Sequence, residues 1–301
     1  MELRQLKTFI TVASTLNFTK AADKLGYAQS SVTAQIKGLE EDLNVRLFER
    51  LGKNVYLTAA GEIFFGYANR ILRLSKEARD ALANDGVLKG TIAIGSVESL
   101  CSSRFPQIYR LFHERYPLVE VTVKIANTNE LKVWLKENSI DVGFFLDILD
   151  APEPDVINEF SMPEPMRIFA AKDHPLTKKK AVTAMDLKDE ALILTESGCS
   201  YRMIFELMLK ESGITPRSML ESGSIKSIKQ LTTCGMGITF LPMVSVEEEL
   251  ANGELAPLNW AGSQLQVETQ LIYHKDKWVT PIMRAFLDTA KEVLDETRVV
   301  V

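Results

Sequence analysis

The sequence is poor in the patterns that mark disulfide-rich proteins and metal sites. Only three cysteines occur among 301 residues, and they are widely separated: Cys101, Cys199 and Cys234. Cysteines so few and so scattered exclude a disulfide framework and a CxxC-type metal site. The three histidines are also far apart and lack the spacing of metal ligands. We therefore expect neither a metal nor another cofactor.

Long apolar runs and catalytic motifs are missing as well. No stretch approaches the roughly 18–20 apolar residues that a membrane-spanning helix needs. The N-terminal sequence MELRQLKTFITV lacks the apolar core and cleavage site of a secretory signal. We therefore expect a cytoplasmic protein without a membrane partner. There is no G-x-S-x-G motif, P-loop or Rossmann glycine run, so the sequence gives no indication of an enzyme.

The distribution of charge is more informative than its total of −5. Residues 1–90 contain 13 Lys and Arg against 10 Asp and Glu, whereas the rest of the chain contains 22 against 30. A mildly basic N-terminal part indicates that this part meets a polyanion. The chain length favours two or three domains.

Helical spacing predicts three short helices at the N-terminus. The first presents an apolar stripe of Leu3, Leu6, Ile10 and Ala13. Asn17 is a suitable N-cap for the second helix, and Gly26 suits the sharp turn that follows it. A third helix is expected over residues 28–43, with Val32, Ile36, Leu39 and Leu43 facing inward. Two helices joined by a tight turn are typical of a helix-turn-helix motif.

The outward face of the third helix is rich in amides and hydroxyls, which can bond to base edges and phosphates in a major groove. A face that is merely solvated is the alternative. The segment LFERLGKNVYLT then predicts a β-hairpin, with residues 52–54 at its tip. Its cations would reach phosphates, as in the wing of a winged helix. The candidate DNA contacts are Thr19, Gln29, Ser30, Ser31, Thr33, Gln35, Lys37, Arg50 and Lys53.

A long helix follows from Thr58 to about residues 84–86. Apolar residues alternate along it by four and three, as in a coiled-coil seam. The seam consists of Phe64, Tyr67, Ile71, Leu74, Ala78 and Ala81. Pairing with a second copy of the chain is favoured. Packing against its own domain is the alternative.

These N-terminal segments resemble the DNA-binding domain of the LysR-type transcriptional regulators. The similarity is carried by four motifs: Ala21-Ala22, Gln29-Ser30-Ser31-Val32-Thr33, Leu39-Glu40-Glu41-Asp42-Leu43 and Leu47-Phe48-Glu49-Arg50. Two positions depart from the family pattern. Ser30 replaces a frequent proline, and Ala34 stands where many relatives have a basic residue.

The resemblance implies an α+β multidomain fold with three parts. They are a winged helix-turn-helix domain over 1–58, a dimerisation helix over 59–88 and an effector-binding domain over 89–301. The implied partners are promoter DNA, a small-molecule effector, further copies of the chain in a homodimer or homotetramer, and RNA polymerase. The resemblance also implies a two-lobed α/β effector domain like that of periplasmic solute-binding proteins.

The pattern after residue 90 supports that layout, because strand-like and helix-like segments alternate. Strands are predicted at 91–95, 119–126, 141–145, 166–171, 191–195, 237–242 and 267–274. Four prolines within residues 152–165 indicate a crossover between lobes, with a return near 260–266. One lobe would then comprise 91–160 and 267–301, and the other 161–266.

Ligands of open α/β sheets bind beyond the carboxyl ends of the strands, beside helix N-termini. This rule places the candidate effector contacts at Ser96, Glu98, Ser99, Cys101, Asn127, Thr128, Ser197, Gly198, Cys199 and Ser200. Hydroxyls and free amides favour a small anion, although each serine could simply cap its helix. Two other functions stay open: a binding protein whose N-terminus serves assembly only, and a redox-sensing regulator that acts through Cys199.

Overall fold

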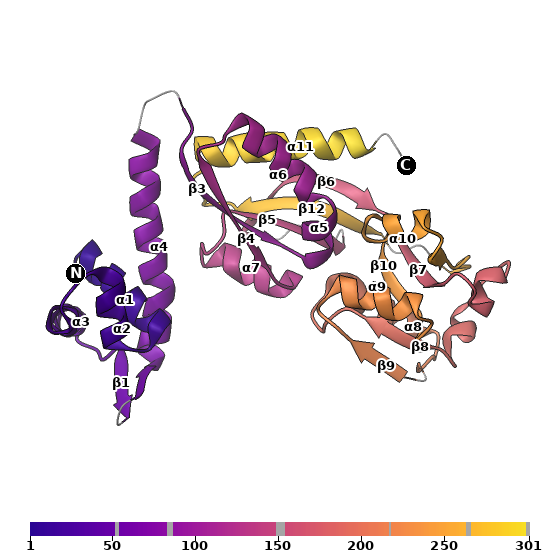
Figure 1. Ribbon diagram of the computed structural model, residues 1–301, viewed down its shortest axis with the longest axis horizontal. Coiled ribbons are helices and arrows are strands. Elements are labelled where there is room, and N and C mark those ends of the chain that lie inside the picture. The colour runs from indigo at the N-terminus through magenta and orange to yellow at the C-terminus, as the bar shows by residue number, and fades with distance from the viewer. Residues whose placement is uncertain (52–53, 83–86, 149–153, 217, 263–265, 299–301) are drawn as a thin grey trace. The chain divides into compact units, whose positions relative to one another are not determined.

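The computed structural model describes most of the chain. The described residues are 1–51, 54–82, 87–148, 154–216, 218–262 and 266–298. They form two compact units, the first made mainly of residues 1–86 and the second of most residues from 87 onward (Figure 1). No helix among these residues is long and apolar enough to cross a membrane.

The first unit begins with the three predicted helices. They are α1 (Leu3–Thr15), α2 (Phe18–Leu25) and α3 (Gln29–Leu43). The side chain of Asn17 accepts hydrogen bonds from the amides of Thr19 and Lys20, which confirms it as the N-cap of α2. Gly26 ends α2 with a φ of 67°, a left-handed conformation that glycine adopts without steric cost.

The buried face of α1 includes the predicted Leu6 and Ala13 but differs from the prediction at the other two positions. Leu3 is exposed, and Ile10 is only half-buried. Phe9 and Val12 are fully buried instead. The ring of Phe9 lies 5.3 Å from that of Phe48 and 5.0 Å from that of Phe64. The packing of Phe9 against these two rings therefore turns its side of α1 inward.

The predicted hairpin is confirmed as strands β1 (Phe48–Leu51) and β2 (Asn54–Leu57). Phe48 pairs with Leu57 and Arg50 with Val55. The hairpin tip, with Lys53, lies outside the described residues, and so does the side chain of Arg50.

Helix α4 (Ala59–Leu82) follows, and the hydroxyl of Thr58 accepts a hydrogen bond from the amide of Gly61 at its start. The structure divides the predicted seam of this helix. Phe64 and Ile71 pack on the core of the first unit, around the fully buried Ala68. Tyr67, Leu74 and Ala78 are exposed. The side chain of Ala81 and the predicted end of the helix lie outside the described residues.

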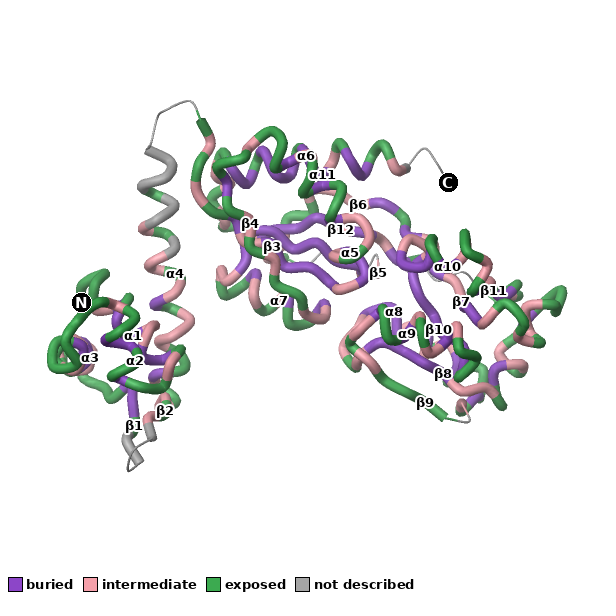
Figure 2. Tube along the Cα trace, in the orientation of Figure 1, coloured by how far each residue is buried: buried purple, intermediate pink, exposed green. Residues whose placement is uncertain are grey.

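The second unit contains two lobes, and lobe I is built on a five-stranded sheet. Its strands are β3 (Gly90–Ser96), β4 (Val119–Ile125), β5 (Val142–Ile148), β6 (Val156–Glu164) and β12 (Val267–His274). Their spatial order is β4-β3-β5-β12-β6, with β12 antiparallel to both of its neighbours. Strand β5 is buried along most of its length (Figure 2).

Helices cover both faces of this sheet (Figure 1). They are α5 (Glu98–Ser103), α6 (Phe105–Arg115), α7 (Thr128–Lys136) and α11 (Pro281–Arg298). Helices α6 and α11 lie side by side, with the rings of Phe112 and Phe286 5.4 Å apart.

Lobe II carries shorter strands. They are β7 (Met166–Ala171), β8 (Ala191–Leu194), β9 (Ser218–Glu221), β10 (Thr239–Pro242) and β11 (Leu255–Pro257). Strands β10, β7 and β11 form one antiparallel sheet, and β8 and β9 form a parallel pair. The helical elements are α8 (Ser200–Glu211), α9 (Ile225–Thr233), α10 (Glu247–Ala251), η1 (Pro175–Lys178), η2 (Ala184–Leu187) and η3 (Met243–Ser245).

The proline-rich segment 152–165 contains more regular structure than predicted. Residues 156–164 form β6, one of the two edge strands of the lobe I sheet, and Pro163 lies opposite Glu268 within it. An edge strand tolerates proline because one side of it needs no amide donors. The chain crosses to lobe II at Pro165, because β7 begins at the next residue.

A buried ion pair fixes the end of β6. The guanidinium of Arg104 bonds to both carboxylate oxygens of Glu164, with its shortest contact at 2.9 Å. Glu164 also accepts a hydrogen bond from the hydroxyl of Thr269 on β12, and Arg104 donates to the hydroxyl of Thr297 on α11. The network therefore joins four elements at the edge of lobe I.

Candidate functional site

The outward face of α3 is exposed as the sequence predicts. Gln29, Ser30, Ser31 and Lys37 are exposed, and Thr33 is half-buried. On the opposite side Val32, Ile36 and Leu39 are buried and anchor the helix to its unit. This face therefore offers amide, hydroxyl and cationic groups on a rigid support.

Two other predicted DNA contacts have different surroundings. The side-chain oxygen of Gln35 accepts a 2.7 Å hydrogen bond from the hydroxyl of Thr8, so Gln35 fastens α3 to α1. Thr19 is exposed in the first turn of α2. Lys37 lies 3.5 Å from Glu41, but both side chains are largely exposed and free to exchange partners.

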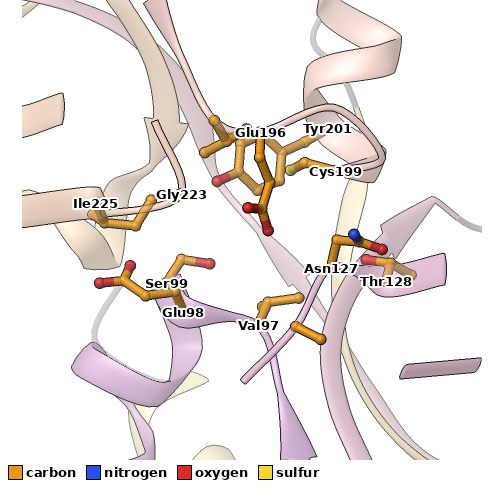
Figure 3. A pocket seen from close by; sticks show the side chains of 12 residues that line it. Val97, Glu98, Ser99, Asn127, Thr128, Glu196, Cys199, Tyr201, Gly223 and Ile225 are labelled. Atoms are coloured by element: carbon orange, nitrogen blue, oxygen red, sulfur yellow. The ribbon is translucent and has the colours of Figure 1, made fainter. Parts of the chain in front are cut away.

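A pocket lies between the two lobes of the second unit (Figure 3). It is a small pocket, with a cavity volume of about 30 Å³. Lobe I contributes residues that follow β3 and β4, and lobe II contributes residues that follow β8 and β9. The twelve lining residues are Val97, Glu98, Ser99, Ala126, Asn127, Thr128, Thr195, Glu196, Cys199, Tyr201, Gly223 and Ile225.

The structure brings five of the ten predicted effector contacts together in this lining: Glu98, Ser99, Asn127, Thr128 and Cys199. The other five do not line the pocket: Ser96, Cys101, Ser197, Gly198 and Ser200. Ser96 is fully buried and bonds to the carbonyl of Val97. The amide of Ser197 donates to Glu221. Cys101 is half-buried on α5.

Gly198 and Ser200 join the lobes without lining the pocket. Gly198 has a φ of +92°, and an added Cβ would lie 3.3 Å from the side chain of Asn127 in lobe I. The hydroxyl of Ser200 donates to the carbonyl of Leu146 on β5, which also accepts from the hydroxyl of Thr128. Lobe II therefore approaches lobe I closely beside the pocket.

Sequence reasoning missed seven lining residues: Val97, Ala126, Thr195, Glu196, Tyr201, Gly223 and Ile225. Glu196 directly follows the predicted strand at 191–195, so its position alone could have identified it. Gly223 and Ile225 follow β9, a strand of four residues that are all exposed. Such a strand lacks the apolar pattern that marks strands in a sequence.

Arg202 holds the lobe II side of the pocket in place. Its side chain is only 9% exposed and bonds to Glu206 at 2.8 Å and to Glu221 at 2.6 Å. It also donates to the carbonyl of Thr195. Because the same Glu221 accepts from the amide of Ser197, the loop after β8 is fixed from two directions.

The thiol of Cys199 is not activated in this setting. Burial raises its pKa, although hydrogen bonds from Thr195 and from the start of α8 oppose the shift. Reactive cysteines have a lowered pKa, since the thiolate is the nucleophile. The raised pKa therefore weighs against redox sensing through Cys199.

Metal-binding geometry is likewise missing from the described part of the chain, where no three His, Cys, Asp or Glu side chains gather in a way that could hold an ion.

Comparison with known protein families accounts for both units. Residues 3–62 match the family model of the bacterial regulatory helix-turn-helix proteins of the lysR family. Residues 85–295 match the LysR substrate binding domain. The first match excludes the alternative of a binding protein whose N-terminus serves assembly only.

Relatives and solved structures agree with this assignment. The chain is 44% identical to the uncharacterised HTH-type transcriptional regulator YwqM of Bacillus subtilis, covering 97% of this chain and 99% of YwqM. It is 34% identical to the transcriptional regulator CbbR of Rhodospirillum rubrum, covering 96% of each.

Among solved structures, full-length CbnR in complex with its target DNA is similar to the chain, with a TM-score of 0.67 and 26% identity. The alignment covers 97% of this chain and all of CbnR. These relatives are transcriptional regulators and not enzymes. The chain is therefore a member of the LysR family of DNA-binding transcriptional regulators.

Proposed function

We propose that this regulator reads operator DNA with the exposed face of α3 and responds to a small molecule bound between its lobes. The observation that carries the first part is the composition of that face. Gln29 and Thr33 are suited to base edges, and Lys37 to a phosphate. The solved complex of CbnR with its target DNA supports the same use of the first unit. A regulator of this kind would work in the cytoplasm, where the DNA is.

The pocket supports the second part of the proposal. It lies where two lobes meet, and residues from both lobes line it. A ligand that contacts both lobes binds one arrangement of the lobes more tightly than the others. It therefore shifts the protein toward that arrangement, which is how a ligand can control a regulator. The predicted anionic group of the effector would find amide donors at the start of α7. Glu98 and Glu196 in the same lining would repel it.

Gln29→Ala and Lys37→Gln are expected to weaken DNA binding in different ways. Loss of a base contact lowers discrimination between operator and unrelated DNA by about 1–3 kcal/mol. Loss of a phosphate contact weakens binding to all sequences alike and reduces the salt slope by about 1. Fluorescence anisotropy with DNA from upstream of the protein's own gene, titrated with salt, measures both effects. Equal losses on operator and unrelated DNA for both variants would contradict this division of roles.

The exposed stripe of α4 supports a dimer. Ile63, Tyr67 and Leu74 are more than half exposed, and they lie at helical spacing on one side of α4. Large apolar side chains aligned in this way favour contact with a second helix. We assign this stripe, and not Phe64 or Ile71, to pairing with another copy of the chain.

Leu74→Lys should therefore convert oligomers into monomers at micromolar concentration, because it places a charge in the paired seam. Sedimentation velocity measures the change. The control is Glu62→Lys, an exposed substitution on the same helix outside the stripe. An unchanged sedimentation coefficient for Leu74→Lys would exclude this stripe as the interface.

A further inference from the structure

The pocket between the lobes has a strongly one-sided charge. Two of its lining residues, Glu98 and Glu196, carry carboxylates, and none of the twelve is Lys or Arg. The remaining polar groups are the hydroxyls of Ser99, Thr128, Thr195 and Tyr201, the amide of Asn127 and the thiol of Cys199. All of these neutral oxygen groups can accept hydrogen bonds. The lining is therefore suited to a ligand that donates hydrogen bonds and carries positive charge.

Glu98 is a carboxylate without a full set of partners. Its Oε2 atom is buried and forms no hydrogen bond. Burial raises the pKa of Glu98, although a hydrogen bond from the Ile225 amide and the charge of Lys229 oppose the shift. Lys229 is engaged elsewhere, because its Nζ lies 2.7 Å from a carboxylate oxygen of Glu249 in a largely buried pair. A buried carboxylate oxygen is costly unless a donor or a cation meets it.

Glu196 faces the same space from lobe II. Its side chain is half-buried, and no hydrogen bond or ion pair holds its carboxylate within the described chain. The Oε2 atom lies against Gly223, where an added Cβ would come within 2.7 Å of it. Figure 3 shows Glu98 and Ser99 on one side of the pocket and Glu196, Cys199 and Tyr201 on the other. Glu98 and Glu196 therefore line the pocket from different lobes, with the carboxylate of Glu196 directed toward its middle and that of Glu98 turned toward Ile225.

We propose that the effector carries a protonated amine, which binds between Glu98 of lobe I and Glu196 of lobe II. This inference rests on the proposed function, since it names the chemical class of ligand for the same pocket. An ammonium group has three donors, so it can bond to the carboxylate of Glu196 and to a neighbouring hydroxyl while the charge of Glu98 attracts it. A carboxylate elsewhere on the effector would meet amides at the start of α7. A small amino acid has both features.

Matched pairs of compounds test the charge of the effector. The unfolding temperature of the full-length protein is measured in the presence of each of the twenty standard amino acids, of small diamines and of amino sugars. Each compound is added at increasing millimolar concentrations. Each compound is compared with its counterpart lacking the amino group, such as alanine with propionate or glutamate with glutarate. We expect at least one amine to raise the unfolding temperature while its counterpart does not. Stabilisation by the acids alone, or by no amine, overturns the inference.

Isosteric variants then locate the amine. Glu98→Gln and Glu196→Gln should each weaken binding of the stabilising amine at least tenfold, as measured by calorimetry. Glu211→Gln, an exposed carboxylate at the end of α8, should bind the amine as the unaltered protein does. Unchanged affinity in both pocket variants overturns the assignment. If Glu98 serves ligand binding and not folding, Glu98→Gln should unfold at the same or a higher temperature.

DNA binding separates this inference from the proposed function. Without ligand, both pocket variants should bind operator DNA as tightly as the unaltered protein, because α3 lies in the other unit. Failure of the unaltered protein to bind any operator contradicts the proposed function itself. If the protein binds operator DNA specifically and only acids without an amino group change that binding, the proposed function holds and the inference of an amine effector is wrong.

Discussion

Gly61→Ala is expected to destabilise the whole first unit and so to weaken DNA binding on heating. A Cβ at this position would lie 2.2 Å from the carbonyl oxygen of Leu47 and 2.9 Å from the side chain of Leu57. The Leu47 backbone cannot easily move away. Its amide is bonded to the carboxylate of Glu40 at 2.7 Å, and its carbonyl accepts from the amide of Thr58.

The size of this effect follows from where the clash falls. Overpacking of a core by one methyl group costs about 1–3 kcal/mol, and a contact with fixed backbone lies at or above the upper end. A unit of this size has only about 5–15 kcal/mol of stability in total. We expect its unfolding temperature to fall by at least about 10 °C.

Gly66→Ala provides a matched control in the same helix. A Cβ at Gly66 would meet no atom within 4 Å, and alanine favours the helical conformation by up to about 1 kcal/mol. This variant should unfold at the same or a higher temperature and still bind DNA. Calorimetry and fluorescence anisotropy on both variants make the comparison. Similar behaviour of the two alanine variants would refute the steric argument.

The second large effect is expected from Arg104→Met in lobe I. The substitution leaves the carboxylate of Glu164 only 1% exposed and without its cation. Breaking a buried pair in this way costs about 3–5 kcal/mol, because the remaining charge stays buried. Urea unfolding should show a loss of that size. The double variant Arg104→Met with Glu164→Gln should recover part of it, since the unpaired charge is then gone.

The loss should also depend on pH. Burial raises the pKa of Glu164 even though Arg104 and Thr269 oppose the shift. A carboxyl whose pKa is higher in the folded state stabilises the fold at low pH, and this contribution is lost as pH rises through the folded pKa. Without Arg104 that pKa rises further. The difference between variant and unaltered protein should therefore be larger at about pH 8 than at about pH 5.

Arg115→Met tests whether burial is the cause. Arg115 forms a bidentate pair with Glu292 at 2.6 Å, but both side chains are more than 40% exposed. Solvent screens such a pair, so the unfolding midpoint should scarcely change at either pH. A loss equal to that of Arg104→Met would show that the geometry of the pair matters more than its burial.

The sequence was sufficient to predict most of the helices and strands, because capping and apolar periodicity are local signals. Asn17, Gly26 and Thr58 mark element boundaries by chemistry that needs no distant partner. The heptad pattern of α4 was less decisive. An apolar stripe indicates that one side of a helix is covered, but it does not identify whether the same unit or a second chain covers it. Phe64 and Ile71 cover the unit's own core, while Tyr67 is exposed.

The rest depended on long-range contacts. Strand β6 was hidden by its prolines, since only its place at the sheet edge makes Pro163 tolerable. At the pocket, the strand ends indicated the right loops but not the directions of their side chains. Glu196 and Ser197 are adjacent, yet only Glu196 lines the pocket; Ser197 is exposed, and its backbone amide bonds to Glu221. The charge of the pocket could therefore not be predicted before the two lobes were seen together.

The strand order of lobe I has a consequence for synthesis on the ribosome. Strand β6 ends at residue 164, yet its partner β12 begins only at residue 267, after all of lobe II. Until β12 emerges, β5 and β6 lack the strand that lies between them. Lobe II, whose strands β7 to β11 are contiguous in the chain, can fold first. Lobe I is therefore synthesised first but completed last, when β12 inserts between β5 and β6.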